Sequence, residues 1–156
     1  MHGRVDLALM EWWDRRPGFT AHCFGSEALV LIVPPGHAWR QIQRVPRERL
    51  IEIELLGGEP GTGTGRLLAD LLGDLAPRLN VRMRLGSTEA VKQWVKAGLG
   101  ASIVLAGALE KERADGSLHV IEIEDGSLRK DLWAIWPEWL TATHPARRLA
   151  EWIVAA

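Results

Sequence analysis

Apolar and polar residues alternate in the middle of the chain and then change to the spacing of a helix. Residues 81–85 place apolar side chains between arginines, the period of two that is typical of a strand. Three apolar residues then recur at helical spacing: Val91, Trp94 and Val95. Between them Ser87 offers an N-cap hydroxyl, and Gly98 is placed to end the helix. The pattern predicts a strand, a turn and a helix in direct succession.

A second strand, turn and helix is predicted upstream. Residues 50–56 alternate between apolar and acidic side chains, and a glycine-rich turn follows at 57–65. Five leucines then mark a helix: Leu67, Leu68, Leu71, Leu72 and Leu75. The turn is not a phosphate-binding P-loop, because Thr64-Gly65 stand where such a loop has Lys followed by Ser or Thr.

The rest of the chain alternates in the same way, which predicts an α/β fold. Residues 101–105 read as a buried strand, 106–114 as a short helix, and 118–124 and 132–136 as two more strands. Pro145 opens a last helix, in which one face is predicted to carry Leu149, Trp152 and Ile153.

Composition indicates a soluble domain with a substantial core. The chain has 156 residues, of which 47% are hydrophobic, and a net charge of −1, so it offers no general attraction to nucleic acid or a membrane surface. No apolar run is long enough to span a bilayer, and no secretory signal is visible. We therefore expect a cytoplasmic location.

Candidate chemistry gathers at the two predicted helix starts. Free backbone amides and hydroxyls there favour a small anion, a carboxylate or an inorganic oxyanion, and neither turn has a Lys or Arg before Arg66. Alternatively, Ser87 only caps its own helix. In the upstream turn, Thr62 and Thr64 can likewise either bind a ligand or cap the helix that follows.

Signals for other chemistry are weak. The one cysteine, Cys23, is expected to be buried or unreactive, and the histidines lack metal-ligand spacing, so no metal and no cofactor are expected. No catalytic signature surrounds the hydroxyls, which indicates binding and not catalysis. Four of the eight tryptophans are expected in the core, namely Trp94, Trp133, Trp136 and Trp152. Trp12 and Trp13 follow a strand end, where open α/β sheets bind ligands. For these two, it is as reasonable to expect that one lines a ligand cleft as that neither does.

Four segments in order resemble the effector-binding domain of LysR-type transcriptional regulators. These are Val5-Asp6-Leu7-Ala8-Leu9, the run from Glu27 to His37, Glu59-Pro60-Gly61-Thr62-Gly63-Thr64, and Gly86-Ser87-Thr88-Glu89-Ala90 with Ala97-Gly98-Leu99-Gly100. The resemblance covers nearly the whole chain.

The resemblance implies a two-lobed fold of the type II periplasmic-binding-protein kind, with lobe two complete and lobe one incomplete. Residues 1–34 and 132–156 would form the remnant of lobe one with the crossover strands, and 35–131 would form lobe two. Full regulators of this family begin with a winged helix-turn-helix, a linker helix and the first elements of lobe one, none of which is seen before Val5. DNA contact is therefore expected only through that N-terminal part.

The resemblance also implies an effector in a cleft between the lobes. The expected effector-binding residues are Thr62, Gly63, Thr64, Ser87, Thr88, Glu11 and Trp12. The family dimer would use the helix from 89 to 97, with the candidate interface residues Glu89, Lys92, Gln93, Lys96 and Ala97. The partner helix of that dimer would precede Val5, so we expect a different homo-oligomer that contacts through lobe one.

Two alternatives share this architecture. A two-lobed solute-binding protein would need an export signal, and an enzyme such as a prephenate dehydratase-like lyase would need an assignable acid or base in the cleft. The small-molecule sensing domain of a regulator fits the residues best.

Overall fold

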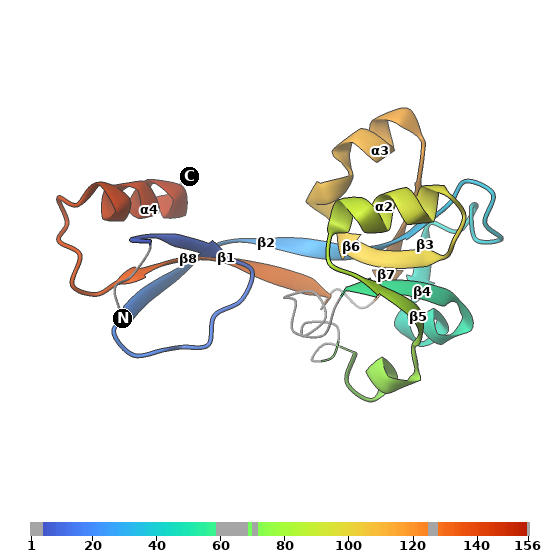
Figure 1. Cartoon of the computed structure of the whole chain (residues 1–156), viewed down its shortest axis with the longest axis horizontal. Helices are drawn as coiled ribbons and strands as arrows, with labels where there is room; N and C mark the ends of the chain where they lie inside the picture. The colour runs from blue at the N-terminus through green and yellow to red at the C-terminus, as the bar shows by residue number, and fades with distance from the viewer. Residues whose placement is uncertain (1–4, 59–68, 70–71, 125–127, 156) are drawn as a thin grey trace. The chain divides into compact units, whose positions relative to one another are not determined.

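The structure, a computed structural model, describes residues 5–58, 69, 72–124 and 128–155. It divides into two compact units. Unit 1 comprises Met1–Glu27 and Lys130–Ala156, and unit 2 comprises Ala28–Arg129. Figure 1 shows both units with the labels used below.

The sheet of unit 2 is mixed. Its strands are the carboxyl half of β2 (Phe19–Val33), β3 (Arg44–Pro46), β4 (Glu54–Gly58), β5 (Asn80–Leu85), β6 (Ala101–Leu105) and β7 (His119–Glu124). The order β2-β6-β4-β5 holds on one side of β2, and β7 and then β3 follow on the other side. β4 runs parallel to both β5 and β6, whereas β2 is antiparallel to β6 and β7.

Strand β2 divides the core of unit 2 because its alternate residues face opposite sides of the sheet. Leu29, Leu31 and Val33 belong to a cluster that includes Leu50. Val30 and Ile32 belong to a second cluster, with residues of the helices. A continuous apolar run is what a strand covered on both faces requires.

Helices supply the two layers that cover this sheet. The α-helices of unit 2 are α2 (Thr88–Lys96) and α3 (Glu110–Asp115), and its 3-10 helices are η1 (Arg47–Glu52), η2 (Gly73–Arg78) and η3 (Ala106–Leu109). Val91 and Val95 of α2 pack in the same cluster as Val30 of β2. Figure 1 shows α2 and α3 together on one side of the sheet.

Unit 1 has fewer elements and a smaller core. β1 (Ala8–Met10) pairs antiparallel with β8 (Arg129–Pro137), β8 lies between β1 and β2, and α4 (Pro145–Ala155) is the one described helix. Four buried residues form its core: Ala134, Trp136, Leu140 and Ala150.

The predicted α/β class and most elements are confirmed, but three segments differ. Residues 50–53 are not strand, because η1 occupies 47–52 and buries Leu50 completely, so β4 starts only at Glu54. β2 begins at Phe19, well before the family-like run that starts at Glu27. Of the helix predicted from the leucines, Leu67, Leu68 and Leu71 lie outside the described residues, while Leu75 lies in η2.

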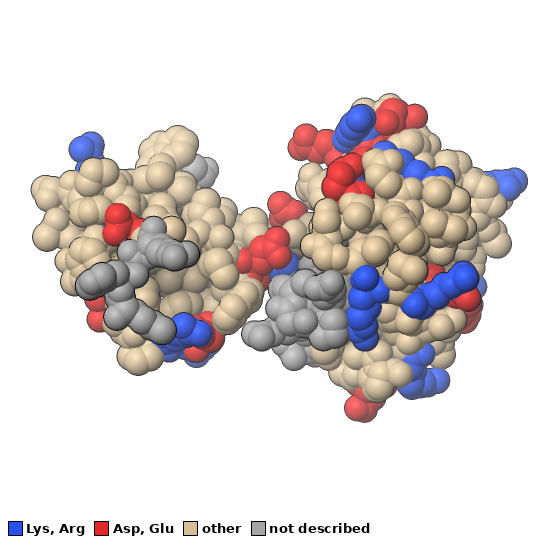
Figure 2. Space-filling model, in the orientation of Figure 1, with Lys and Arg blue, Asp and Glu red and all other residues tan. Residues whose placement is uncertain are grey.

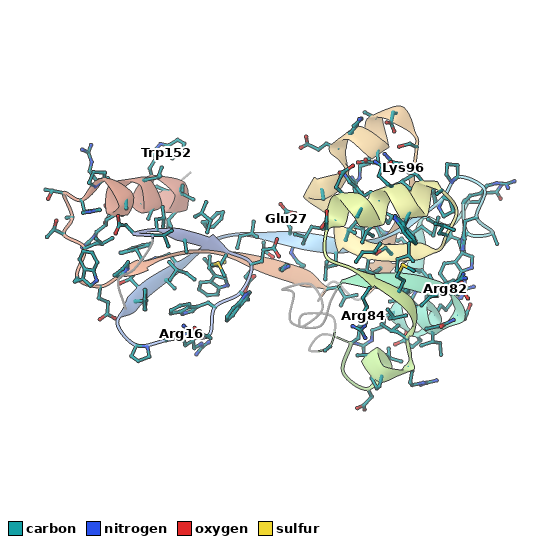
Figure 3. All side chains as sticks on the ribbon, viewed as in Figure 1. Arg16, Glu27, Arg82, Arg84, Lys96 and Trp152 are labelled. Carbon is teal, nitrogen blue, oxygen red and sulfur yellow. The ribbon has the colours of Figure 1, made fainter. Side chains whose placement is uncertain are left out.

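Three side chains predicted on buried helix faces are exposed. Trp94 is 36% exposed, Leu149 50% and Trp152 69%. Helix α4 buries Ala150 instead and packs Ala146 and Val154 against the unit 1 core. Figure 3 shows Trp152 on the side of α4 that faces away from the strands. Helical spacing defines a stripe, but which of two neighbouring stripes faces the sheet depends on the tertiary packing.

Of the two expectations for Cys23, buried or unreactive, the first is wrong, because Cys23 is exposed. The Cys23 thiol donates a hydrogen bond to the carbonyl of Gly25 at 3.3 Å.

Candidate functional site

The corner between β5 and α2 has the form that the sequence predicts. Ser87 has the extended backbone of an N-cap, and its hydroxyl oxygen accepts a hydrogen bond from the Ala90 amide at 3.4 Å. The Ser87 carbonyl accepts the first helical bond, from Val91, at 3.0 Å. At the other end, Gly98 has a φ of 78° and ends the helix as predicted.

This corner is open to solvent. Gly86, Ser87 and Thr88 are all exposed. The first amides of an α-helix have no carbonyl within the helix to bond, and the helix dipole places partial positive charge at the same end. A serine hydroxyl that accepts a capping bond can still donate its own O–H to a ligand oxygen.

Glu89 brings a carboxylate to the first turn of α2. Its oxygens accept hydrogen bonds from the Lys92 ammonium and the Gln93 amide, both at 2.9 Å. The Lys92 hydrogen bond, followed by that of Gln93, holds the pKa of Glu89 below its ordinary value. The negative charge of Glu89 is therefore bound along the helix surface and not directed at the capping corner.

The end of β4 lies beside the end of β5. The two strands are parallel, and Gly58 is in register with Leu85. The carboxyl ends of parallel neighbours meet at one edge of a sheet, which is where open α/β sheets bind ligands. Thr62, Gly63 and Thr64 come soon after Gly58 in the chain, but they lie outside the described residues.

A buried ion cluster joins α2 to α3. The Glu112 side chain is 1% exposed and accepts hydrogen bonds from Lys96 at 2.9 Å and from Lys92 at 3.3 Å. Lys92 also donates to the carbonyl of Ala108 at 3.0 Å. The Lys96 bond is the largest cause that lowers the pKa of Glu112, and the Glu89 bond is the largest that raises the pKa of Lys92. This cluster fixes the orientation of α2 in unit 2.

The expected dimer residues occupy different positions on α2. Glu89, Gln93 and Ala97 are exposed, whereas Lys92 is buried and Lys96 half-buried against Glu112. Lys96 is labelled in Figure 3.

Glu11 and Trp12 lie in unit 1, directly after β1. A carboxylate oxygen of Glu11 accepts a hydrogen bond from the ammonium of Lys130 on β8. Trp12 is 37% exposed. The next residue, Trp13, packs edge-on against Phe19, with ring centroids 6.3 Å apart.

Sequence reasoning missed the two most deeply buried charges, Lys130 and Glu112. Lys130 stands between Arg129 and Asp131, and Glu112 between Lys111 and Arg113. Both runs look like solvated surface. The only sequence signal that could have pointed to a buried acid such as Glu112 was the helical spacing of Lys92 and Lys96, which presents two cations on one face of α2.

Within the described residues, no group of three His, Cys, Asp or Glu side chains is arranged to hold a metal ion. No helix found in that part of the chain combines the length and the apolar character needed to cross a membrane.

Comparison with known families gives a match over the whole chain. A family model described as the LysR substrate binding domain matches residues 1–156. The transcriptional regulator CbbR of Rhizobium meliloti is 32% identical over 132 residues, which is 84% of this chain and 42% of that protein. The transcriptional activator CmpR of Synechocystis is 32% identical over 72% of this chain and 37% of that protein. The chain thus spans less than half the length of these relatives.

Solved structures show the same fold. The regulatory domain of CcmR from Synechocystis, in complex with 2-PG, superposes with a TM-score of 0.84 at 21% identity, over 97% of this chain and 73% of that one. The effector-binding domain of QuiR in complex with shikimate gives a TM-score of 0.72 at 15% identity, over 96% of this chain and 69% of that one. These neighbours have the two-lobed architecture. The two relatives above are named as a transcriptional regulator and a transcriptional activator, and the two structures as a regulatory domain and an effector-binding domain.

Proposed function

We propose that this chain, which belongs to the LysR substrate-binding domain family, senses a small anion, either a carboxylate or an inorganic oxyanion. The match to the family model over residues 1–156 is the observation that carries the sensing function. The CcmR domain with 2-PG and the QuiR domain with shikimate support a small ligand for this type of domain.

The proposed contact in unit 2 is the amino end of α2. Ser87 and Thr88 supply exposed hydroxyls, and the first amides of the helix supply donors that have no acceptor within the helix. The pairing of Gly58 with Leu85 supports a shared edge for the turns after β4 and β5. Thr62, Gly63 and Thr64 are therefore proposed to take part. In unit 1, Glu11 and Trp12 are the proposed contacts.

Substitutions at Ser87 test this contact without losing the helix cap. Asn and Asp are both good N-cap residues, so Ser87→Asn and Ser87→Asp should unfold at similar temperatures without ligand. They differ by one negative charge. A bound anion should stabilise the parent by about 2.7 kcal/mol at a hundredfold excess over its dissociation constant. We expect Ser87→Asn to keep part of this stabilisation and Ser87→Asp to lose it.

The measurement is thermal unfolding against a panel of inorganic phosphate, sulfate and small mono- and dicarboxylates. Thr141→Asn is the control, because Thr141 is exposed in unit 1. Equal ligand responses of Ser87→Asn and Ser87→Asp would show that no anion binds at this corner. If no member of the panel stabilises the parent, the proposed ligand class is wrong.

For the whole protein, we propose transcriptional regulation with DNA recognised outside these 156 residues. The relatives CbbR and CmpR are named as helix-turn-helix regulators, and this chain has a net charge of −1. DNA-binding domains depend on a basic surface to neutralise phosphates. Sequence-specific retardation of DNA by this chain alone in a gel-shift assay would contradict this assignment.

We also propose that the chain forms a homo-oligomer through unit 1. Most of the exposed large hydrophobic residues belong to this unit: Val5, Leu9, Trp12, Phe19, Trp139, Leu149 and Trp152. Figure 2 shows mostly uncharged surface over the visible face of unit 1. Exposed apolar surface of this extent favours association with another chain.

A further inference from the structure

A hollow of about 320 Å³ lies on the surface of unit 2, between α3 and the strands β7 and β3. In the described part of the chain β3 pairs only with β7, so the hollow lies at an edge of the sheet. The residues that line it come from α3, from β7, and from β3 with the residue before it: Arg113, His119, Val120, Glu122, Gln43 and Arg44.

Strand register places Arg44 and Glu122 together on one face of the sheet. They are partners in the parallel pairing of β3 with β7, and such partners share a face. Their neighbours Val45 and Ile121 point the other way, into the apolar cluster on the opposite face. Arg44 and Glu122 therefore face the side that α2 and α3 cover, where Val120 packs against the second cluster.

Positive charge exceeds negative charge among the residues that line this hollow. Arg113 is exposed in the last turn of α3 and, within the residues that the structure describes, no acidic side chain pairs with its guanidinium. Arg44 contacts Glu122 through its Nε at 2.9 Å, but the two side chains are 70% and 63% exposed. An ion pair in water contributes little, so Glu122 does not hold Arg44 firmly.

Two hydrogen bonds fix the strand side of the hollow. The Glu122 amide donates to the Gln43 carbonyl at 2.8 Å. Nε2 of His119 lies 2.8 Å from the carbonyl oxygen of Ile42, which can only accept, so this nitrogen is the donor. Both bonds join β7 to the segment before β3. A wall that is already ordered lowers the entropy cost of binding a ligand.

This hollow is far from the amino end of α2. In unit 2, β3 lies at one edge of the sheet, and β5, which leads into α2, lies at the other. With neighbouring strands about 4.8 Å apart, the two edges are separated by roughly 24 Å across the sheet. A small anion bound at Ser87 therefore cannot also contact Arg44.

We infer that this hollow is a second ligand site, which binds a phosphate group between Arg44 of β3 and Arg113 of α3. The planar N–H fork of a guanidinium matches two oxygens of a phosphate. A phosphate has further oxygens for a second fork, whereas a carboxylate has only two in all. The volume of the hollow is that of a small-molecule pocket. The ligand is therefore inorganic phosphate or a small phosphate monoester, and the inference does not depend on anion binding at α2.

Isothermal titration of Ser87→Asp with inorganic phosphate tests this site, because that substitution blocks the corner proposed for the first anion. We expect Ser87→Asp to bind phosphate, and the further substitution Arg113→Gln to weaken this binding at least about tenfold. Arg44→Gln should weaken it as well. Lys111→Gln is the matched control, because Lys111 is exposed on the same helix and loses the same charge. Its affinity should stay within about twofold.

Removal of the carboxylate should have the opposite effect. We expect Glu122→Gln, in the same background, to bind phosphate about threefold more tightly, because a negative charge near the ligand is removed. Glu110→Gln, at an exposed position of α3, is its control. Circular dichroism checks that each variant is folded.

Titration with glycerol 3-phosphate separates the two sources of the phosphate group. Binding tighter than that of inorganic phosphate, and lost in Arg113→Gln, supports a phosphate monoester as the ligand. Equal or weaker binding that also depends on Arg113 supports the free anion.

Four results would overturn the inference. If the parent binds phosphate but Ser87→Asp does not, the proposed function is supported and the second site does not exist. If Arg113→Gln binds phosphate as tightly as Lys111→Gln does, the anion is not in this hollow. If acetate binds Ser87→Asp as tightly as phosphate does, the ligand class is wrong. If the parent binds no phosphate, this inference fails, while stabilisation of the parent by a carboxylate would still support the proposed function.

Discussion

Lys96 of α2 donates a hydrogen bond at 2.9 Å to Glu112 of α3, and the side chain of Glu112 is 1% exposed. Lys92 contributes a second bond to the same carboxylate. A buried carboxylate with two ammonium partners is stable only while all of its partners remain, because each charge has lost its hydration. The first turn of α3 is therefore tied to the middle and the end of α2.

Substitution of Glu112 should destabilise the chain strongly. We expect Glu112→Ala to lower the free energy of unfolding by about 3 kcal/mol, because two partly buried ammonium groups lose their carboxylate. Urea denaturation measures the change. Glu110→Ala, at an exposed position of the same helix, should cost less than about 0.5 kcal/mol. Equal costs for the two variants would contradict the structural role given to Glu112.

The same carboxylate should make stability depend on pH in the acidic range. The Lys96 hydrogen bond lowers the pKa of Glu112 below its ordinary value of 4.5 in the folded state. Its contribution is complete above the unfolded-state pKa and is lost as the pH falls through the lower, folded-state pKa. Urea midpoints measured across this range should fall with pH less steeply in Glu112→Gln than in the parent. Parallel curves for both proteins would refute the assignment.

The capping role of Ser87 predicts a small cost that is independent of ligand. Its hydroxyl accepts the Ala90 amide at a long 3.4 Å. We therefore expect Ser87→Ala to cost about 0.5 kcal/mol, at the low end of the range for N-caps. Thr88→Ala, just inside the helix, should leave the unfolding free energy within about 0.5 kcal/mol of the parent. A cost above that of a strong cap would indicate a further structural role for the hydroxyl.

A side chain at either of two glycines after α2 should lower the stability of the chain. Gly98 has a φ of 78° and Gly100 a φ of 149°, where a Cβ would lie 3.3 Å from the Glu54 carbonyl oxygen. We expect Gly98→Ala to cost about 1 kcal/mol from backbone strain and Gly100→Ala to cost more. Gly36→Ala is the control, since a Cβ there meets nothing within 4 Å. Thermal unfolding ranks the three variants, and an equal effect at all three positions would contradict the backbone argument.

The exposed face of α4 should govern self-association. Leu149 and Trp152 are 50% and 69% exposed, so charged substitutions there should not disturb the core. If unit 1 makes the contact, Leu149→Lys and Trp152→Glu should each weaken association roughly tenfold. Light scattering across a concentration series measures this. Leu99→Lys, exposed in unit 2, is the control. A parent chain that stays monomeric at every concentration would rule out the proposed oligomer.

Local patterns determined much of unit 2. The alternation at 81–85, the hydroxyl of Ser87 and the glycine at 98 each act within a few residues, and β5, α2 and its cap appear where these signals predict them. The candidate site followed from the same signals, because the donors at a helix start are a property of the helix itself. Ligand binding at Ser87 and Thr88 stays a prediction, as it does for Thr62, Gly63 and Thr64.

Other features depended on which surfaces meet. Residues 50–53 alternate as a strand would, yet Leu50 reaches the core from a 3-10 helix, because packing in the tertiary structure outweighs a weak local preference. Trp152 lies on an apolar stripe of α4, but Ala146, Ala150 and Val154 form the stripe that the unit 1 core accommodates. Lys130 and Glu11 are 119 positions apart in sequence, and only the register of β1 on β8 brings them together. Sequence by itself determined β5, α2 and the cap of α2. The buried charges and the exposed apolar face were decided by contacts between elements, which no local pattern records.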